Sequence, residues 1–470
     1  MARRFEDQGG MATIDPPAIV RWLTSKVMTR MSSPAAVARR RAKAERARQR
    51  RSEPHRIEYF HQIDDGYSHL AAQLLRPLLE RYDVELVFHL VSAVHDRNLP
   101  EPELLLRLSR YDSAKIAPHY GLRFPAETEG TDPELVELAG RIIAAATPAD
   151  VPEVAVAVGD ALWAADGAAM DALARERGAA PADDASARTA AGNARRARLG
   201  HYSGAMLHYG GEWYWGADRL YHLENRLIDL GAGKGDTDEL LCPRPEIEFG
   251  PLRDDGSLTF EIYPSLRSPY TSLIFDLAVR LAERTGVRMV MRPVLPMVMR
   301  GVPATRQKGS YIFSDAAREA RALGLEWGRV WDPIGKPVRN GYSLYPWAVK
   351  QGKGTELLSS FLRAAFFDGV NTNNDRGMQR VVENAGLSWE EARSVMGNRD
   401  WEDELEENRL AMYGSGLWGV PSFRRCRSWT SGWHARPGTR RPAPRWHGVG
   451  VCCRSAWWRL SMPDSSAGSR

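Results

Sequence analysis

The chain has 470 residues, 43% of them hydrophobic, and a formal net charge of +5. This length favours about two to four domains, and the hydrophobic content suffices for packed cores, which argues against a disordered chain. No apolar run reaches the roughly 18 residues of a membrane span. The basic start, with Arg3 and Arg4, lacks the apolar stretch of a secretory signal, so we expect a cytoplasmic protein.

The charge is unevenly distributed along the chain. Residues 1–54 carry 13 Lys and Arg against five acidic residues, and residues 424–470 carry ten Arg against one, Asp464. The stretch between them therefore has a net charge of −12. An acidic body argues against a basic nucleic-acid groove. We expect neither nucleic acid nor a membrane as a partner of the folded body.

Residues 1–54 are predicted to form a basic N-terminal arm. Apolar residues, among them Trp22, Leu23 and Val27, precede a run of Arg and Ala that ends at Arg51. This pattern is typical of a basic amphipathic helix. A solvated helical arm is one interpretation, and an arm that binds a membrane surface or RNA is the other.

An internal repeat follows the arm. An offset of 203 residues holds without a gap for more than fifty residues, and further downstream it grows to 215, where Gly204 pairs with Gly419. We interpret the repeat as a duplication. The pairs at 203 are Tyr67 with Tyr270, Arg81 with Arg284, Val84 with Val287, Val91 with Val294, Asp112 with Asp315, and Gly121-Leu122 with Gly324-Leu325.

Each copy opens with a strand, a helix and a second strand. In copy one these are residues 57–60, 70–82 and 84–91, and in copy two they are 258–263, 273–284 and 287–294. A βαβ unit of this kind predicts a parallel strand pair. Helical stretches follow, and a late strand and turn close each copy. The predicted domains are 55–242 and 257–423, joined by a linker at 243–256 that contains three prolines and Asp254-Asp255-Gly256.

A specific motif follows the first strand of copy two, Ser268-Pro269-Tyr270-Thr271-Ser272-Leu273. It resembles the turn that opens the first helix in the DsbA-like thioredoxin-fold family, in the branch of 2-hydroxychromene-2-carboxylate isomerases and kappa-class glutathione transferases. Arg292-Pro293-Val294-Leu295 and Gly419-Val420-Pro421 extend the resemblance over residues 257–423. The fold class it implies is α/β, with two tandem thioredoxin-like (DsbA-type) domains, each carrying a helical insertion.

The chemistry of the motif depends on the helix terminus. Unpaired N–H groups and the helix dipole stabilise an anion there, and thiol oxidoreductases place a reactive cysteine at this position. The resemblance implies that Ser268 is catalytic and stabilises the thiolate of bound glutathione. It also implies that Pro269, Tyr270, Val420 and Pro421, with Pro421 as a cis-proline, and further away Lys308 and Asp218, bind glutathione or substrate. The alternative is an ordinary Ser-Pro helix cap.

Copy one departs from this motif. Asp65 and Gly66 stand where copy two has Ser268 and Pro269, and an aspartate would repel a thiolate. Gly204-Ala205-Met206 lacks the late proline. Asp218 lies in Trp215-Gly216-Ala217-Asp218-Arg219-Leu220, which resembles the family's Trp-Gly-x-Asp-Arg-Leu ending, and it is either a vestigial cap or part of a changed pocket. We expect copy one to be catalytically degenerate.

Three functions are compatible with the sequence. The first is a glutathione-dependent isomerase or transferase, with glutathione as cofactor and a small molecule as substrate. The second is a non-catalytic tandem binding protein. The third, a DsbA-type thiol-disulfide oxidoreductase, has the fold but lacks a Cys-x-x-Cys. No metal is expected, because the histidines of copy one, including His61 and His89, are more typical of hydrogen-bonded core positions. A homodimer is left open.

The last segment, residues 424–470, has a different composition. It holds five of the 15 Trp, three of the four Cys and ten Arg, and it contains no Lys, Glu, Ile, Phe, Tyr, Asn or Gln. This composition is typical of an out-of-frame reading of a GC-rich gene, so we infer a frameshift near residue 424. An Arg- and Trp-rich tail that binds nucleic acid or membrane is the alternative.

Overall fold

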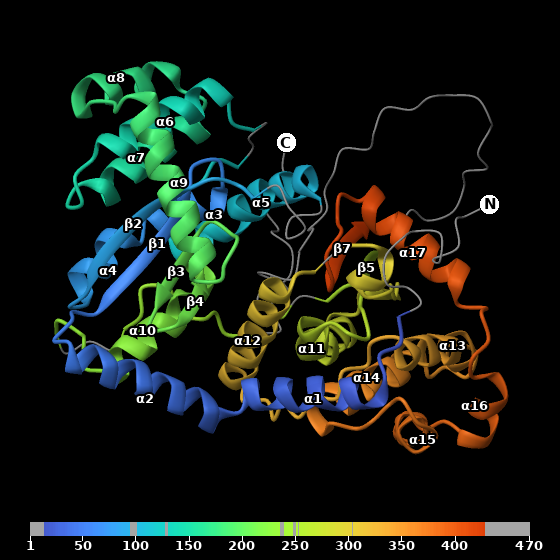
Figure 1. Ribbon diagram of the computed structural model, residues 1–470. Coiled ribbons are helices and arrows are strands. Elements are labelled where there is room, and N and C mark those ends of the chain that lie inside the picture. The colour runs from blue at the N-terminus through green and yellow to red at the C-terminus, as the bar shows by residue number, and fades with distance from the viewer. Residues whose placement is uncertain are drawn as a thin grey trace, which may run out of the picture. The chain divides into compact units, whose positions relative to one another are not determined.

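The computed structural model describes residues 14–94, 101–126, 130–235, 239–247, 251, 253–302 and 304–427 (Figure 1). They form two compact units. Unit 1 comprises Met1–Ser33, Glu246–Ala304 and Ile312–Arg470, and unit 2 comprises Pro34–Pro245 and Thr305–Tyr311. The division between Pro245 and Glu246 falls inside the expected linker. No helix among the described residues is long and apolar enough to cross a membrane.

Unit 2 is built on a four-stranded sheet of order β2-β1-β3-β4. Strand β1 (Arg56–Gln62) pairs parallel with β2 (Glu85–Val91) and antiparallel with β3 (Met206–Tyr209), which pairs antiparallel with β4 (Glu212–Trp215). The predicted helix 70–82 is two shorter helices, α3 (Gly66–Ala72) and α4 (Leu75–Arg81). These and α10 (Leu220–Asp229) pack on the sheet face that carries Ile57, Tyr59 and Leu207.

A helical insertion separates β2 from β3. It comprises α5 (Pro102–Ile116), α6 (Pro133–Ala145), α7 (Val151–Trp163), α8 (Gly167–Arg177) and α9 (Ala182–Arg198). Helices α6 to α9 share a second apolar core with Ala72 of α3 and Leu90 of β2. Helix α9 lies across β2, and Gly192 permits this packing because a side chain there would collide with the Leu90 carbonyl (Figure 1).

Unit 1 has a sheet of order β6-β5-β7 in the part of the chain that the structure describes. Strand β5 (Leu258–Tyr263) pairs parallel with β6 (Arg288–Met291), and α11 (Pro269–Thr285) connects them. The elements that follow are α12 (Arg306–Ala322, whose first residues belong to unit 2), α13 (Lys336–Lys350), α14 (Gly354–Arg363), α15 (Asp375–Asn384), α16 (Trp389–Val395) and α17 (Glu402–Gly414).

Strand β7 (Ser422–Arg427) pairs antiparallel with β5. Its last four residues lie past the expected domain boundary at residue 423. Strand pairing uses backbone N–H and C=O groups, so the unusual side-chain composition does not prevent it. The rest of the inferred out-of-frame segment, residues 428–470, lies outside the described residues.

The same contacts recur in both units at the 203-residue offset. The Tyr67 hydroxyl donates to Asp112 Oδ2 at 2.6 Å, and that of Tyr270 donates to Asp315 Oδ2 at 2.8 Å. The late offset is 216 and not 215, because the ladders pair Phe60 with Met206 and Tyr263 with Ser422. Ala205, with φ of 54°, therefore occupies the position of Pro421.

The N-terminal arm is two helices that pack against the units, which differs from a solvated arm. Helix α1 (Ala18–Ser32) belongs to unit 1 and α2 (Pro34–Arg50) to unit 2. Arg41 of α2 forms a bidentate ion pair with Glu212, with both distances 2.8 Å. The sequence pattern predicted one amphipathic helix and not its division into two. It also did not indicate their packing, since their partners are distant in the chain.

Candidate active site

Ser268 caps the N-terminus of α11. Its backbone is extended, with φ of −92° and ψ of 118°, and Pro269 occupies the first helical position. Ser268 Oγ accepts the Thr271 N–H at 3.2 Å, which satisfies one of the unpaired donors of the first turn. The same hydroxyl donates to the Val420 carbonyl at 3.2 Å. Ser268 is thus a helix cap that also contacts the late loop.

The late loop Gly419–Pro421 is held by several polar contacts. The Val420–Pro421 peptide bond is cis. The buried Arg300 donates to the carbonyls of Leu295 at 2.8 Å and Trp418 at 3.2 Å. At the start of β7, Ser422 Oγ donates to the Gly419 carbonyl at 2.7 Å. No local sequence pattern indicates the role of Arg300, because that role depends on a loop more than a hundred residues away.

An ion pair supports the turn from the other side. Arg267, the residue before Ser268, donates to both carboxylate oxygens of Asp332 at 2.7 and 2.9 Å. Burial tends to raise the pKa of Asp332, but the Arg267 guanidinium outweighs this effect and holds that pKa below its usual value. The pair fixes the backbone that carries Ser268, and sequence analysis did not identify it.

Tyr270 contributes to the first turn of α11 through a buried cluster. Its hydroxyl donates to Asp315 Oδ2 at 2.8 Å, and Arg318 donates to Asp315 Oδ1, also at 2.8 Å. All three side chains come from helices α11 and α12. The hydroxyl of Tyr270 is therefore engaged in positioning the turn.

The equivalent turn of unit 2 carries Asp65 in place of the serine. Asp65 caps α3, with Oδ2 accepting the N–H of Ser68 at 3.1 Å and its hydroxyl at 2.9 Å. Asp65 Oδ1 accepts the Ser109 hydroxyl of α5 at 3.0 Å. Gly66 lies directly under Ser113 and Phe124, since a Cβ there would be 2.7 Å from Ser113 Oγ. The turn is covered by α5 and carries a carboxylate.

The predicted site residues fall into two groups. Ser268, Pro269, Tyr270, Val420 and Pro421 lie together in unit 1. Asp218 and Lys308 belong to unit 2. Asp218 pairs with its neighbour Arg219 at 3.0 Å, and Lys308 is buried.

The chain around Lys308 contacts aromatic residues of unit 2. Three residues further along the chain, the Tyr311 ring lies 4.9 Å from that of His201 and 5.8 Å from that of Trp215, between ring centroids. The segment Thr305–Tyr311 is thus part of the packing of unit 2. The sequence could not indicate this, since it lies between two segments of unit 1.

The histidines of unit 2 are hydrogen-bonded. His61 Nδ1 lies 3.1 Å from the Tyr59 hydroxyl, and His89 Nε2 lies 3.0 Å from Glu58 Oε2. His61 and His89 lie on opposite faces of the sheet, because His89 pairs with Phe60, the residue before His61. Among the residues placed by the structure, no group of three His, Cys, Asp or Glu could hold a metal ion.

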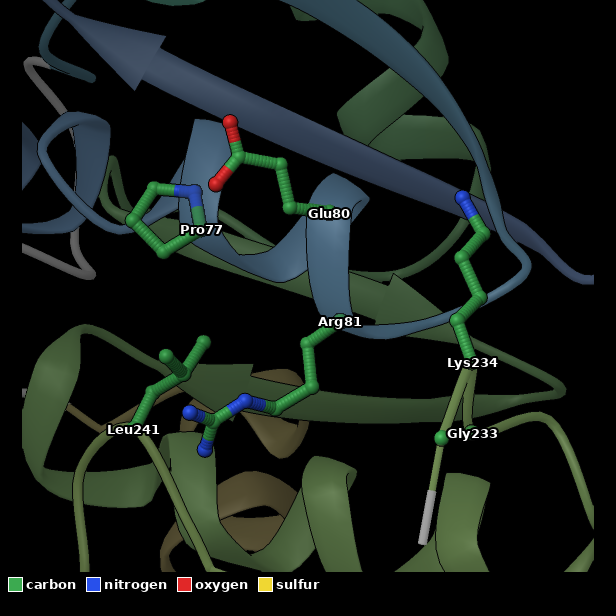
Figure 2. Close-up of a pocket in the computed structure, with 7 residues that line it drawn as sticks. Pro77, Glu80, Arg81, Gly233, Lys234 and Leu241 are labelled. Carbon is green, nitrogen blue, oxygen red and sulfur yellow. The ribbon is translucent and has the colours of Figure 1, made fainter. Parts of the chain in front are cut away.

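A hollow of about 280 Å³ in unit 2 does not involve Asp65. It lies between α4 and the loop after α10 (Figure 2). Its two cations do not converge, since the Arg81 guanidinium turns towards Leu241 and the Lys234 side chain extends away from it. Arg81 donates to the Glu239 carbonyl and Lys234 Nζ to the Leu79 carbonyl, so both serve to close the loop. The lining residues are Pro77, Glu80, Arg81, Gly233, Lys234, Gly235 and Leu241.

Comparison with known proteins identifies one domain within unit 1. Residues 259–425 match the DSBA-like thioredoxin domain. A probable DsbA oxidoreductase from Streptomyces coelicolor aligns at 23% identity over 37% of this chain and 82% of its own, with a TM-score of 0.30. A 2-hydroxychromene-2-carboxylate isomerase aligns at 14% identity over 35% and 84%, with a TM-score of 0.31. No curated protein matches the chain. The match to the family model by itself identifies residues 259–425 as a DSBA-like thioredoxin domain.

Proposed function

We propose that unit 1 is a glutathione-dependent enzyme that resembles the 2-hydroxychromene-2-carboxylate isomerases, with Ser268 as the group that stabilises the glutathione thiolate. The observation that carries the proposal is the position of the Ser268 hydroxyl. It lies at the N-terminus of a 17-residue helix, within 3.2 Å of the Val420 carbonyl, inside the segment that matches a DsbA-like domain.

The donors at this position fit an anionic sulfur. The positive end of the α11 dipole favours negative charge, and the hydroxyl can turn its proton from the Val420 carbonyl towards a thiolate. While it does so, Ser268 Oγ keeps the Thr271 N–H as a donor, which polarises the hydroxyl further. Bound glutathione would supply a nucleophile that adds reversibly to a conjugated double bond. Residue 268 is not a cysteine, so the turn itself offers no thiol for disulfide exchange.

We further propose that the two units arose by tandem duplication and that unit 2 has lost the catalytic turn. The shared Tyr–Asp hydrogen bonds at the 203-residue offset support a common origin. A second shared hydrogen bond also supports it. The Gln62 N–H donates to Ser68 Oγ in unit 2, and the Ser265 N–H donates to Thr271 Oγ1 in unit 1, each across six residues. The carboxylate of Asp65 supports the loss, since it would repel a thiolate.

Calorimetric titration of glutathione into the full chain tests the proposed role of Ser268. Ser268→Ala removes the donor, and we expect binding at a pH where the thiolate is populated to weaken at least about tenfold. Ser388→Ala is the matched control, because Ser388 also caps a helix, accepting the Glu391 N–H at 3.4 Å. Equal affinity in the wild-type protein and Ser268→Ala, or equal losses in both variants, would reject the role of Ser268.

The alternative is a non-catalytic binding protein, which the engagement of the Ser268 hydroxyl with both Thr271 and Val420 favours. Binding of glutathione without any turnover of conjugated α,β-unsaturated acids would favour this alternative. If glutathione does not bind detectably, both the glutathione-dependent enzyme and a binding protein that holds glutathione are rejected.

A further inference from the structure

Helix α1 is held to unit 1 by its polar side. Arg21 and Ser25 are both only 2% exposed. The Arg21 guanidinium donates to the Asp332 carbonyl at 3.0 Å and to the Ile334 carbonyl at 2.5 Å, and it pairs with Asp15 at 2.7 Å. Ser25 Oγ accepts the Asp332 N–H at 3.0 Å. The face of α1 that a soluble protein would ordinarily turn to water is thus the buried face.

The opposite side of α1 is apolar and exposed. Ile19, Leu23 and Val27 are 62, 50 and 56% exposed and follow one another at intervals of four residues, so they line one face. Val20 and Trp22 extend this surface. These five are among only eight large apolar side chains exposed in the described part of the chain, so the concentration is not the scatter expected of a protein surface. We call these five residues the α1 apolar surface.

Positive charge borders the α1 apolar surface. Lys26 Nζ lies 5.9 Å from the centroid of the Trp22 ring, Arg30 is exposed in the last turn, and α1 contains no acidic residue. Helix α2 follows after a single residue, Ser33, and exposes five more cations. These are Arg39, Arg40, Lys43, Arg46 and Arg50. The only acidic residue of α2, Glu45, is paired with Arg48 at 2.7 Å.

We propose that the N-terminal helices α1 and α2 bind an anionic lipid surface. An apolar helix face that carries a tryptophan and is bordered by Lys and Arg is the combination that inserts at the level of lipid headgroups. Cations beside it add attraction to acidic headgroups, and apolar and polybasic elements together give more durable attachment than either does alone. The exposed cations of α2 supply the second element.

Charge argues against another part or another copy of this protein as the partner of the α1 apolar surface. A second copy related by two-fold symmetry would bring the same apolar face with the same Lys and Arg border, which repels itself. The C-terminal segment from 428 onwards is also cationic, with seven Arg and a single acidic residue. An anionic surface satisfies the apolar face and the border together.

Vesicle sedimentation tests the proposal with the full chain. We expect binding to vesicles of equal parts phosphatidylglycerol and phosphatidylcholine, weak binding to pure phosphatidylcholine, and a decrease as NaCl rises to about 0.15 M. The double variant Leu23→Gln/Val27→Gln should lower the partition coefficient at least about tenfold. The control Val349→Gln/Leu410→Gln changes the same two residue types at 50 and 51% exposure and should leave it unchanged.

A second variant set tests the contribution of charge. Arg39→Gln/Lys43→Gln/Arg46→Gln should weaken binding to the anionic vesicles by about tenfold or more, whereas Lys350→Gln/Arg376→Gln/Arg393→Gln, also exposed, should not. Circular dichroism of each variant establishes that it is folded. Absence of vesicle binding, or equal losses in both variant sets, overturns the proposal. So does a concentration-dependent dimer that Leu23→Gln/Val27→Gln abolishes without any vesicle binding.

Discussion

The turns at Asp65 and Ser268 occupy the same place in their units, but their side chains make different contacts. Both residues cap the helix that follows the first strand, and both accept the N–H three residues along the chain. Asp65 then accepts two further hydroxyl groups and is covered by α5. Ser268 instead contacts the late loop at Val420, beside a cis-proline.

The difference shows that one backbone arrangement can carry caps with different hydrogen-bonding capacity. Capping needs only an oxygen acceptor, which an aspartate supplies as well as a serine. Stabilising an incoming anion needs a donor, which only the serine supplies. The helix terminus is therefore capped in both units, while the side chain on it decides whether the turn can also donate a hydrogen bond to an anion.

Removing the central buried glutamate of each sheet should have the largest effect. Glu58 accepts two hydrogen bonds from Arg195, both 2.6 Å, and lies 3.0 Å from His89. Its counterpart Glu261 pairs with Arg292 at 2.9 Å and Arg424 at 3.2 Å. Glu58→Gln should destabilise unit 2 by about 3 kcal/mol, because it leaves Arg195 without its counter-charge.

Glu261→Gln should cost unit 1 less, about 1–2 kcal/mol, because its hydrogen bonds are longer. Hydrogen exchange with mass spectrometry on peptides from each sheet assigns the loss to a unit. Glu356→Gln, which breaks an exposed pair with Lys353, is the control and should change stability by less than about 0.5 kcal/mol. Equal effects of the two core substitutions would contradict this ranking.

Converting the unit 2 turn towards that of unit 1 should fail on steric grounds. Gly66→Pro places atoms where Ser113 Oγ and Phe124 already lie, at 2.7 and 3.0 Å from a Cβ. We expect a loss of about 2–3 kcal/mol in urea unfolding. Adding Ser113→Ala should recover part of the loss. Full stability of Gly66→Pro alone would mean that α5 does not constrain the turn.

Mild acid should loosen unit 2 through His61, whose counterpart in unit 1 is Pro264. Burial lowers the pKa of His61 from 6.5 to about 3. Below pH 6.5 the unfolded chain therefore binds a proton at His61 that the folded protein excludes. The contribution of neutral His61 to the free energy of unfolding is complete above pH 6.5 and declines as the pH falls towards 3. The expected loss is about 2 kcal/mol by pH 5.

Urea unfolding followed at several pH values measures this loss, and His61→Phe should flatten the dependence. Burial also lowers the pKa of His55, which acts in the same direction, so some dependence should remain in the variant. An unchanged slope in His61→Phe would assign the acid sensitivity elsewhere.

Replacing the two capping residues, Ser268 and Asp65, by alanine should give the smallest difference in unfolding free energy between the units. Ser268→Ala removes one cap bond and should cost about 1 kcal/mol, whereas Asp65→Ala also leaves the Ser109 hydroxyl without this acceptor and should cost about 2 kcal/mol. Thermal unfolding of both variants measures the difference. A larger loss for Ser268→Ala would contradict the structural role assigned to Asp65.

The sequence predicted the local features of the fold better than its distant contacts. Strand alternation and the Ser-Pro signal depend on neighbouring residues, so the βαβ units and the cap at Ser268 could be anticipated. The break between α3 and α4 was missed, because the apolar pattern runs on across it.

Contacts across the chain gave no comparable signal. Arg300 and the Arg267–Asp332 pair depend on partners 65 to 118 residues away. The burial of Arg21 depends on carbonyl groups more than three hundred residues away, so no local pattern could indicate that the polar side of α1 faces inward.

The contact of α1 with the loop around Asp332 has a consequence for how this protein can be divided. Ser25 and Arg21 hold the loop whose carboxylate clamps Arg267, the residue before Ser268. A fragment that begins at the first strand of unit 1 would keep Ser268 and lose these supports. The unit that carries Ser268 is therefore discontinuous in sequence, and its first piece precedes the whole of the other unit.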